Sequence, residues 1–188
     1  TGDNEAYKVN FYSTFTNLNC EPSHLDFFKR TPDLNRLIFD QDAIFVGGGN
    51  TKSMLAVWKE WGLDKILRKA YQKGVVMSGV SAGAICWFEN GVTDSWSSSL
   101  KLMPCLNFIK GTCCPHYDEE PERKPTVRKF LMNEKVKNVY AADGGAALHI
   151  KNEQSFTAVV FKKDKSSYLV TLKDKNLVEK SFRKKILI

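Results

Sequence analysis

The sequence lacks a long hydrophobic segment, and its first residues do not resemble a secretory leader. A membrane-spanning helix needs about 20 consecutive apolar residues, and a leader combines a basic start with an apolar stretch. Neither pattern occurs in the 188 residues. We therefore expect a cytoplasmic protein with no membrane partner.

Cysteine and histidine are too few or too irregularly spaced for the common disulfide and metal frameworks. The five cysteines form an odd count without Cys-x-x-Cys spacing, which predicts free, buried thiols and no metal site. Any catalytic histidine must be one of three: His24, His116 or His149.

Positive charge is in excess, at a net +7, but it is not concentrated in one basic stretch. Near the end of the chain, in "FKKDKSSYLVTLKDKNLVEKSFRKKILI", lysines alternate with acidic and apolar residues. This alternation is typical of the solvent-exposed face of strands, whereas nucleic-acid binding needs a continuous basic patch or stripe. We expect no nucleic-acid partner.

Segments typical of buried strands alternate with helical segments in the first half of the chain. "AIFV" (residues 43–46) and "VVMSGV" (75–80) are apolar, and between them a helical run from Lys52 to Gly74 is broken near Gly62. The alternation predicts an α/β fold with a parallel sheet covered on both faces.

The remaining segments complete the expected single domain, residues 1–188. "HLDFF" (24–28) is expected as a short strand, and Thr31 as the N-cap of the next helix. A helix from about Glu5 follows an opening loop, and because a loop that leads into a helix usually follows a strand, a further strand before residue 1 is one expectation. Short polar-flanked β segments after residue 146 predict an antiparallel hairpin or meander at the edge of the sheet.

Ser81 occupies the third position of Gly79-Val80-Ser81-Ala82-Gly83, which matches the G-x-S-x-G nucleophile elbow. In that motif a strained turn between a strand and a helix exposes the serine, and small neighbours let the turn close. An apolar strand precedes Ser81 and a helical run, "AGAICWF", follows it. Ser81 is therefore a nucleophile candidate, with a packed turn serine as the alternative.

A serine nucleophile needs a base, and the base needs a carboxylate. His116 in "CCPHYDEE" is the best candidate base, because it comes just after "NFIKGTC" (107–113), a further predicted strand. Glu89 and Asp94 are the candidate acids. A regular helix would carry Glu89 about 12 Å from Ser81, but Asn90-Gly91 indicates that the helix has ended by then. The spacing from Ser81 therefore does not decide between Glu89 and Asp94 as the acid of the triad.

The glycine-rich loop "FVGGGNT" follows the first predicted strand. Its backbone N–H groups can approach a bound oxyanion closely, so one N–H of this loop, together with the N–H of Ala82, is expected to form an oxyanion hole. Asn50 and Thr51, directly after the glycines, are expected to contact substrate. A simple glycine turn is the alternative.

The combination of "GGGNT", then "GVSAGA" about 30 residues later, then "PHY" after a further strand resembles peptidase E and its relatives, the S51 serine peptidases. The resemblance covers about residues 42–148. It implies a three-layer sandwich with a mostly parallel sheet, similar to class I glutamine amidotransferases and flavodoxin-like proteins. It also implies a hydrolase of peptide bonds that needs no cofactor, whose founding members cleave dipeptides with an N-terminal aspartate. It further implies Gly48 or Gly49 as the loop residue of the oxyanion hole.

The resemblance bears on the acid as well. In the founding type an aspartate lies near the place of Asp94, with a longer spacing from the serine, whereas other members use a glutamate. "SAGAICWFE" resembles the latter and favours Glu89 slightly. Asp143 in "AADGGAALHI" is expected to bind the substrate's α-amino group, with a β-turn as the alternative.

We therefore expect a serine-dependent dipeptidase or aminopeptidase that forms an acyl-enzyme on Ser81. Its expected partner is a short peptide substrate, and the chain is expected to act as a monomer or homodimer. The alternatives are a cyanophycinase-like hydrolase, an esterase, or a non-catalytic amidotransferase-like binding module.

Overall fold

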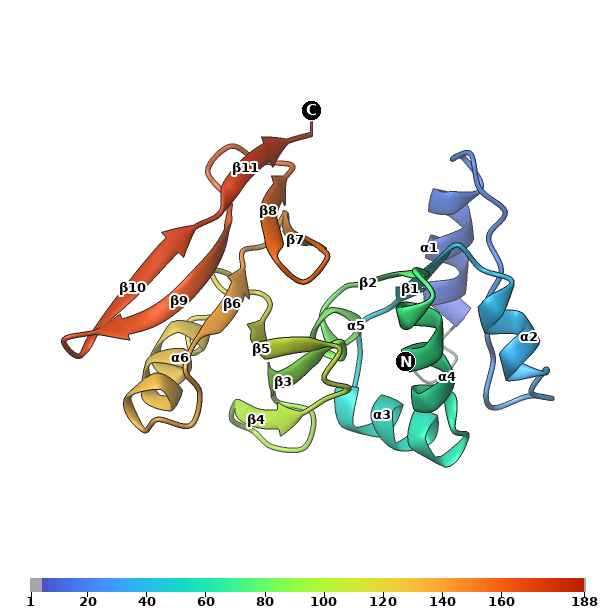
Figure 1. Ribbon diagram of the computed structural model, residues 1–188, viewed down its shortest axis with the longest axis horizontal. Helices are drawn as coiled ribbons and strands as arrows, with labels where there is room; N and C mark the ends of the chain where they lie inside the picture. Colours follow the sequence, from blue (N-terminus) through green and yellow to red (C-terminus); the bar gives the residue numbers. More distant parts are fainter. Residues whose placement is uncertain (1–4, 188) are drawn as a thin grey trace. The chain divides into compact units, whose positions relative to one another are not determined.

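The computed structural model describes residues 5–187. The chain divides into two compact units, Thr1–Gly83 and Ala84–Ile188, each of which has its own β-structure (Figure 1). Within the described residues, no helix combines the length and the apolar character that crossing a membrane requires.

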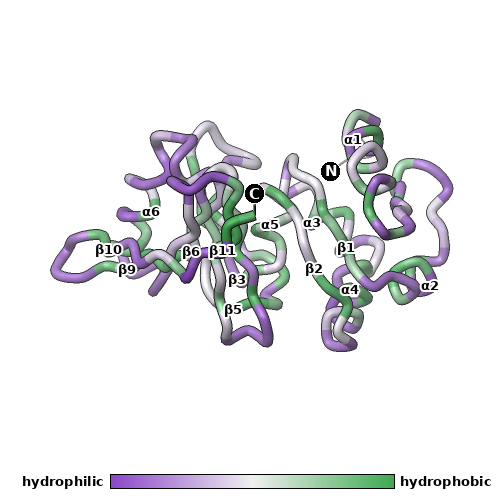
Figure 2. The backbone as a smooth tube through the Cα atoms, turned by 90° about the horizontal axis from the view of Figure 1, so that it is seen from above, coloured by the Kyte–Doolittle hydropathy of each residue, from purple (hydrophilic) through white to green (hydrophobic). Residues whose placement is uncertain are grey.

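The first unit is built on two short parallel strands, which Figure 2 shows side by side. They pair from Ala43 opposite Val76 to Val46 opposite Gly79. The elements of the unit are α1 (Glu5–Phe15), α2 (Leu34–Phe39), β1 (Ala43–Val46), α3 (Thr51–Glu60), α4 (Leu63–Gln72) and β2 (Val76–Gly79). A parallel pair needs a long crossover, and α3 and α4 supply it.

The predicted helical run between the strands is confirmed, together with its break. Gly62 separates α3 from α4 and has a φ of +67°, a left-handed conformation that glycine adopts without steric cost. The amphipathic helix α4 buries Leu63, Leu67 and Ala70, which recur at helical spacing on one face.

Two expectations before β1 are wrong. Residues 24–28 form no strand, because Asp26 in that segment is instead paired with Lys8 of α1 at 3.1 Å. The helix α2 begins at Leu34, and its N-cap is Asp33 rather than Thr31. The Asp33 carboxylate accepts hydrogen bonds from two free N–H groups of the first turn, as a capping side chain does.

The second unit contains a six-stranded sheet in the order β10-β9-β6-β5-β3-β4 and a three-stranded sheet in the order β11-β8-β7. Its elements are α5 (Ala82–Ile85, which begins in the first unit), β3 (Phe88–Thr93), β4 (Lys101–Pro104), β5 (Ile109–Cys114), α6 (Arg123–Met132), β6 (Val139–Ala142), β7 (Ala146–Lys151), β8 (Ser155–Val160), β9 (Ser167–Lys173), β10 (Asn176–Ser181) and β11 (Arg183–Ile186).

The expectation of a mostly parallel sheet is wrong, because the β-structure is mixed. Among the described residues four strand pairs are parallel and four are antiparallel. Residues 94–100 between β3 and β4 are too few for a crossover, which takes a dozen or more residues, so β4 returns antiparallel. Only β3, β5 and β6 form a parallel core in the large sheet, with α6 as the crossover between β5 and β6.

The expected antiparallel hairpin at the sheet edge is β9–β10. Its two-residue turn, Asp174 and Lys175, has φ values of 50° and 63°, and two positive φ angles suit the twist of a tight hairpin. In the same region β7 pairs antiparallel with β8, and β11 adds to β8 in parallel.

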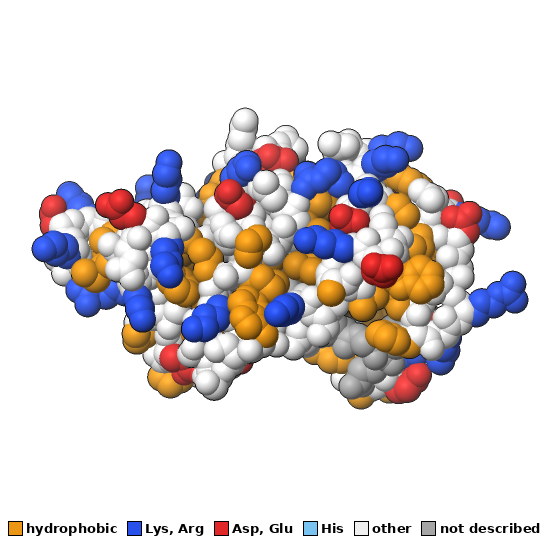
Figure 3. Space-filling view, turned by 90° about the horizontal axis from the view of Figure 1, so that it is seen from below, with side chains coloured by type: hydrophobic (Ala, Val, Ile, Leu, Met, Phe, Trp, Pro, Cys, Tyr) orange, Lys and Arg blue, Asp and Glu red, His pale blue; other side chains and the backbone are white. Residues whose placement is uncertain are grey.

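Basic side chains are dispersed over the surface. On the face in Figure 3, lysine and arginine side chains lie singly among acidic and apolar ones. Every residue of β11 is exposed, and β10 has one half-buried position. This exposure confirms the prediction that the lysine-rich end of the chain forms solvated strand faces.

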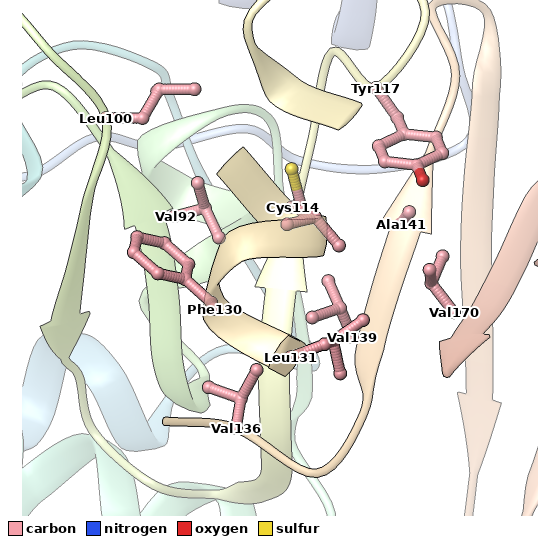
Figure 4. Packing of buried hydrophobic residues seen from close by; sticks show 11 residues of the cluster. Val92, Leu100, Cys114, Tyr117, Phe130, Leu131, Val136, Val139, Ala141 and Val170 are labelled. Carbon is pink, nitrogen blue, oxygen red and sulfur yellow. The ribbon is translucent and has the colours of Figure 1, made fainter. Parts of the chain in front are cut away.

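The core of the second unit lies between α6 and the large sheet (Figure 4). Val127 and Leu131 of α6 pack with Val139 of β6 and Val170 of β9, and three of these four side chains are completely buried. This cluster holds β5 and β6 in place, and the loops at their C-terminal ends carry several of the predicted site residues.

Candidate active site

Ser81 lies in a tight turn between β2 and α5 and has a φ of +54°. A non-glycine residue rarely adopts this left-handed conformation, which costs on the order of 1–3 kcal/mol and persists only where the surroundings enforce it. The turn is enforced by two backbone hydrogen bonds, from Val80 N–H to the Val46 carbonyl at 3.0 Å and from Gly83 N–H to the Val80 carbonyl at 2.9 Å. The geometry is that of a nucleophile elbow.

The two glycines of the motif are required because the backbones of β1 and the elbow lie too close for side chains. A Cβ at Gly79 would lie 2.7 Å from the Val46 carbonyl oxygen. A Cβ at Gly83 would lie 2.5 Å from the Val46 carbonyl carbon. Glycine stands two residues before and two residues after Ser81 because this packing leaves no room for a side chain at either position.

The glycine-rich loop after β1 lies beside the serine. A Cβ built on Gly48 would be 3.3 Å from Ser81 Cβ and 3.8 Å from Ser81 Oγ. Gly48 is buried, and Gly49 has a φ of +130°, a backbone conformation open to glycine. The structure therefore brings the predicted oxyanion loop and the predicted nucleophile together within the first unit.

Asn50 and Thr51 have structural roles at the start of α3. The Asn50 side chain accepts a hydrogen bond from the Ser53 N–H at 2.9 Å and caps the helix, and Thr51 is 1% exposed. Both residues follow the loop beside Ser81 directly, but the cap already occupies the Asn50 side-chain oxygen.

In the second unit, three predicted site residues follow the C-terminal ends of neighbouring parallel strands. Asp94 follows β3, His116 follows β5, and Asp143 follows β6. Gly91 pairs with Cys113, and Cys114 with Ala141, so the three strands end at nearly the same level. Ligands of parallel α/β sheets bind at this edge.

His116 has a φ of +54°, and its Nδ1 lies 2.8 Å from Oε2 of Glu119. Sequence reasoning missed Glu119, although the spacing of three residues in "HYDE" could have indicated it. The Glu119 side chain is 53% exposed, and contacts between exposed charges contribute little to stability. Glu119 nonetheless is the carboxylate that meets the imidazole in this unit.

Glu89 lies toward the other end of β3. Its Oε2 accepts a hydrogen bond from the Gly111 N–H at 3.2 Å, near the start of β5. His116 is five positions after Gly111, two of them beyond the end of β5 at Cys114, which corresponds to roughly 16 Å of extended chain. Of the two predicted acids, Asp94 is the one at the His116 end of the parallel strands.

Asp143 is 7% exposed and is engaged by the protein itself. Its Oδ2 accepts hydrogen bonds from the Ser166 N–H at 3.0 Å and from the Tyr168 hydroxyl at 2.9 Å. Burial and then this bond to a carboxylate raise the pKa of Tyr168 to about 12. Asp143 therefore fastens the start of β9 to the loop after β6.

Four of the five thiols are poor nucleophiles at neutral pH. Burial raises the pKa of Cys105 to about 12 and that of Cys114 to about 11, and it raises those of Cys86 and Cys113 well above the ordinary value. The thiolate is the reactive form, so these residues stay protonated. Cys20 is exposed, contrary to the expectation that all five thiols are buried.

Side chains that could bind a metal ion do not form a cluster among the described residues. Within residues 5–187, no three His, Cys, Asp or Glu side chains are grouped so that they could hold a metal ion.

Ser81 and the glycine loop belong to the first unit, whereas Glu89, Asp94, His116 and Asp143 belong to the second. Each unit thus carries a distinct part of the predicted machinery. The first holds a strained serine next to a glycine-rich backbone, and the second holds a histidine and acids at a strand edge.

The chain is similar in sequence to proteins named as peptidases. It is 46% identical over 180 residues to the uncharacterized peptidase YgaJ of Bacillus subtilis strain 168, which covers 95% of this chain and 78% of that protein. It is 34% identical over 130 residues to Peptidase E of Pasteurella multocida strain Pm70, which covers 63% of this chain and 55% of that protein.

A crystal structure of a protein named after peptidase E, from Listeria monocytogenes EGD-e, aligns with a TM-score of 0.47 at 20% identity, over 79% of this chain and 64% of that one. This chain spans little more than half the length of the Pasteurella relative. The family model of peptidase family S51 matches residues 1–158. The chain therefore belongs to peptidase family S51.

Proposed function

We propose that this protein hydrolyses peptide bonds through an acyl-enzyme on Ser81. The observation that carries the proposal is the left-handed backbone of Ser81 in a turn that lies against the Gly48 backbone. A serine in a strained, tightly packed elbow beside a glycine-rich backbone supports a role in attack rather than in packing alone. Membership of a peptidase family supports a peptide as the substrate.

In the proposed reaction, His116 accepts the Ser81 hydroxyl proton while Ser81 Oγ bonds to the scissile carbonyl carbon. The carbonyl electron pair moves to its oxygen, and the N–H groups of Ala82 and of Gly48 or Gly49 stabilise that oxyanion. The C–N bond then breaks, and His116 donates the proton to the departing amine. Water repeats the sequence on the acyl-enzyme.

The assignment of His116 as the base rests on its chemistry and on its place after β5. His24 contacts the Tyr12 hydroxyl at 2.8 Å and lies 3.4 Å from Asp26, so it is engaged elsewhere. His149 is on β7, a strand of the smaller sheet. His116 alone of the three follows a strand of the parallel core.

For the acid that orients His116 we infer Asp94 in preference to Glu89, because the strand register supports Asp94. Glu119 is the competing carboxylate, since it already contacts Nδ1. Asp94→Asn is expected to lower kcat about 10³- to 10⁴-fold, as removal of a triad acid does. Glu89→Gln and Glu119→Gln are expected to lower it less than tenfold. If the loss with Glu119→Gln is the greatest of the three, the acid is Glu119.

The substrate proposed is a short peptide, cleaved in the manner of a dipeptidase or aminopeptidase. The resemblance to peptidase E, and the names of the relatives, support this class. The backbone of the loop that carries Asn50 and Thr51 is the proposed substrate contact. The Asp143 carboxylate is held by the Ser166 N–H and the Tyr168 hydroxyl, so a role for it in binding the α-amino group needs its other oxygen, Oδ1. A cyanophycinase-like hydrolase or an esterase would use the same nucleophile on another acyl group.

A fluorophosphonate probe combined with a dipeptide panel tests the proposal. The probe should label wild-type protein at Ser81 and should fail to label Ser81→Ala, while His116→Ala should label slowly. Ser78→Ala is the matched control, because Ser78 is a β2 serine whose Oγ donates to the Ile44 carbonyl at 2.9 Å. A wild-type protein that neither labels nor cleaves any dipeptide would favour a non-catalytic binding module.

A further inference from the structure

One face of α1 carries three aromatic residues at helical spacing. Tyr7, Phe11 and Phe15 recur every four residues and so lie on the same side of the helix. The rings of Phe11 and Phe15 lie 6.3 and 5.6 Å from the ring of Phe45 on β1, measured between centroids. This stripe packs α1 against the strand that leads into the glycine-rich loop.

Tyr7, at one end of this stripe, packs against the glycine-rich loop after β1. Two ring atoms of Tyr7 are each 3.0 Å from the point where a Gly47 Cβ would be, so the ring uses the space that a side chain there would fill. Tyr7 is 45% exposed, and the stripe changes from phenylalanine to tyrosine at the position nearest Ser81. Packing alone does not require a hydroxyl at this position.

That hydroxyl is close to the serine. The Tyr7 hydroxyl oxygen lies 2.8 Å, and Ser81 Oγ 3.8 Å, from the position of a Gly48 Cβ. Both distances are measured from the same point, so the Tyr7 hydroxyl oxygen and Ser81 Oγ are at most about 6.6 Å apart. An oxyanion lies two bonds from the attacking Oγ, and its donor lies about 3 Å beyond it, so a donor lies up to about 5.4 Å from Oγ. The separations allowed for the Tyr7 hydroxyl, up to about 6.6 Å, include this range.

The position of α1 is reinforced next to Tyr7. Lys8 Nζ lies 2.8 Å from a Glu5 carboxylate oxygen and 3.1 Å from one of Asp26. These hydrogen bonds, first to Glu5 and then to Asp26, raise the pKa of Lys8 above its usual value, so the lysine stays charged. The helix is thus tied to the segment before α2 at the turn that carries Tyr7.

We propose that the Tyr7 hydroxyl is a third oxyanion donor and hence a catalytic residue of the Ser81 reaction. As Ser81 Oγ bonds to the carbonyl carbon and the electron pair moves to the carbonyl oxygen, the phenol donates a hydrogen bond to that oxygen. Its own proton is not transferred. When the C–N bond breaks, the electron pair returns and the hydrogen bond weakens. This role rests on the proposed function of Ser81.

Tyr7→Phe tests the role, because it keeps the ring and removes only the hydroxyl. The expected result is a kcat about a hundredfold lower with KM within twofold, as expected for a donor that acts on the transition state. Tyr12→Phe is the matched control: it removes a hydroxyl from the same helix, one that contacts His24 instead. Its kcat should equal that of the wild type.

The outcomes separate the two proposals. If the wild type labels with the fluorophosphonate but Tyr7→Phe keeps kcat within threefold, the donor role fails and the Ser81 mechanism stands. A higher KM with unchanged kcat also overturns the donor role, because it assigns Tyr7 to ground-state binding. If the wild type does not label at Ser81, both proposals fail together.

Discussion

Gly83→Ala adds one methyl group where the elbow meets β1. The new Cβ would lie 2.7 Å from Val46 Cβ, whereas two carbon atoms at their best contact are about 3.5–4.0 Å apart. The backbone of α5 and that of β1 must therefore separate by roughly 1 Å. Overpacking costs about 1–3 kcal/mol, and a contact with the Val46 backbone places this one in the upper part of that range, about 2–3 kcal/mol. After the gain of up to about 1 kcal/mol that alanine brings to a helix, a net loss of about 1–2 kcal/mol remains.

We expect Gly83→Ala to melt roughly 2–8 °C below wild type, since each kcal/mol is worth about 2–4 °C in a chain of this size. Because Ser81 lies two residues away, kcat should fall more than the folded fraction does. Gly62→Ala is the control: it has a φ of +67° and no atom within 4 Å of the new Cβ, so it should keep kcat. A Gly83→Ala protein that melts at or above wild type with full activity would refute the packing argument.

Three further predictions concern other parts of the molecule. The hydrogen bond from Lys8 lowers the pKa of Asp26. The ionised Asp26 therefore stabilises the fold above about pH 4, and this stabilisation is lost as the pH falls through the lowered pKa. The melting-temperature gap between wild type and Asp26→Asn should thus close below pH 3, and a constant gap would contradict it. In the folded protein at pH 8, Ellman's reagent should titrate one thiol quickly, that of Cys20, and all five after denaturation. Fast reaction of more than one would contradict the burial of Cys86, Cys113 and Cys114 and the partial burial of Cys105. Asp143→Ala should cost about 1–3 kcal/mol by leaving the Ser166 N–H and the Tyr168 hydroxyl unpaired, and an unchanged melting temperature would show that water replaces the carboxylate.

Local signals predicted the part of the first unit from β1 to the elbow well, whereas the strand expected at residues 24–28 and the N-cap expected at Thr31 were wrong. The apolar run "AIFV", the break at Gly62 and the G-x-S-x-G turn each depend on a few neighbouring residues. Such features are set by backbone sterics and short-range packing, and they appear in the structure where they were expected. The conformation of Ser81 follows from the same local chemistry.

Contacts between distant segments were not predictable in the same way. Glu89 and Asp94 lie on or beside one strand, and only the pairing of β3 with β5 separates them relative to His116. The antiparallel return of β4 depends on the length of the loop after β3 and has no strong turn signal. Tyr7 belongs to a visible helical stripe, but its place beside Gly48 depends on how α1 packs on β1.

Ser81 and His116 share a φ of +54°, a conformation that glycine would adopt without strain. Replacing either by glycine should therefore relieve backbone strain and raise the melting temperature, while it removes the proposed nucleophile or the proposed base. A library selected only for heat resistance would enrich for sequences without the proposed catalytic side chains at these two positions. Directed evolution of this protein needs a selection for turnover alongside any selection for stability.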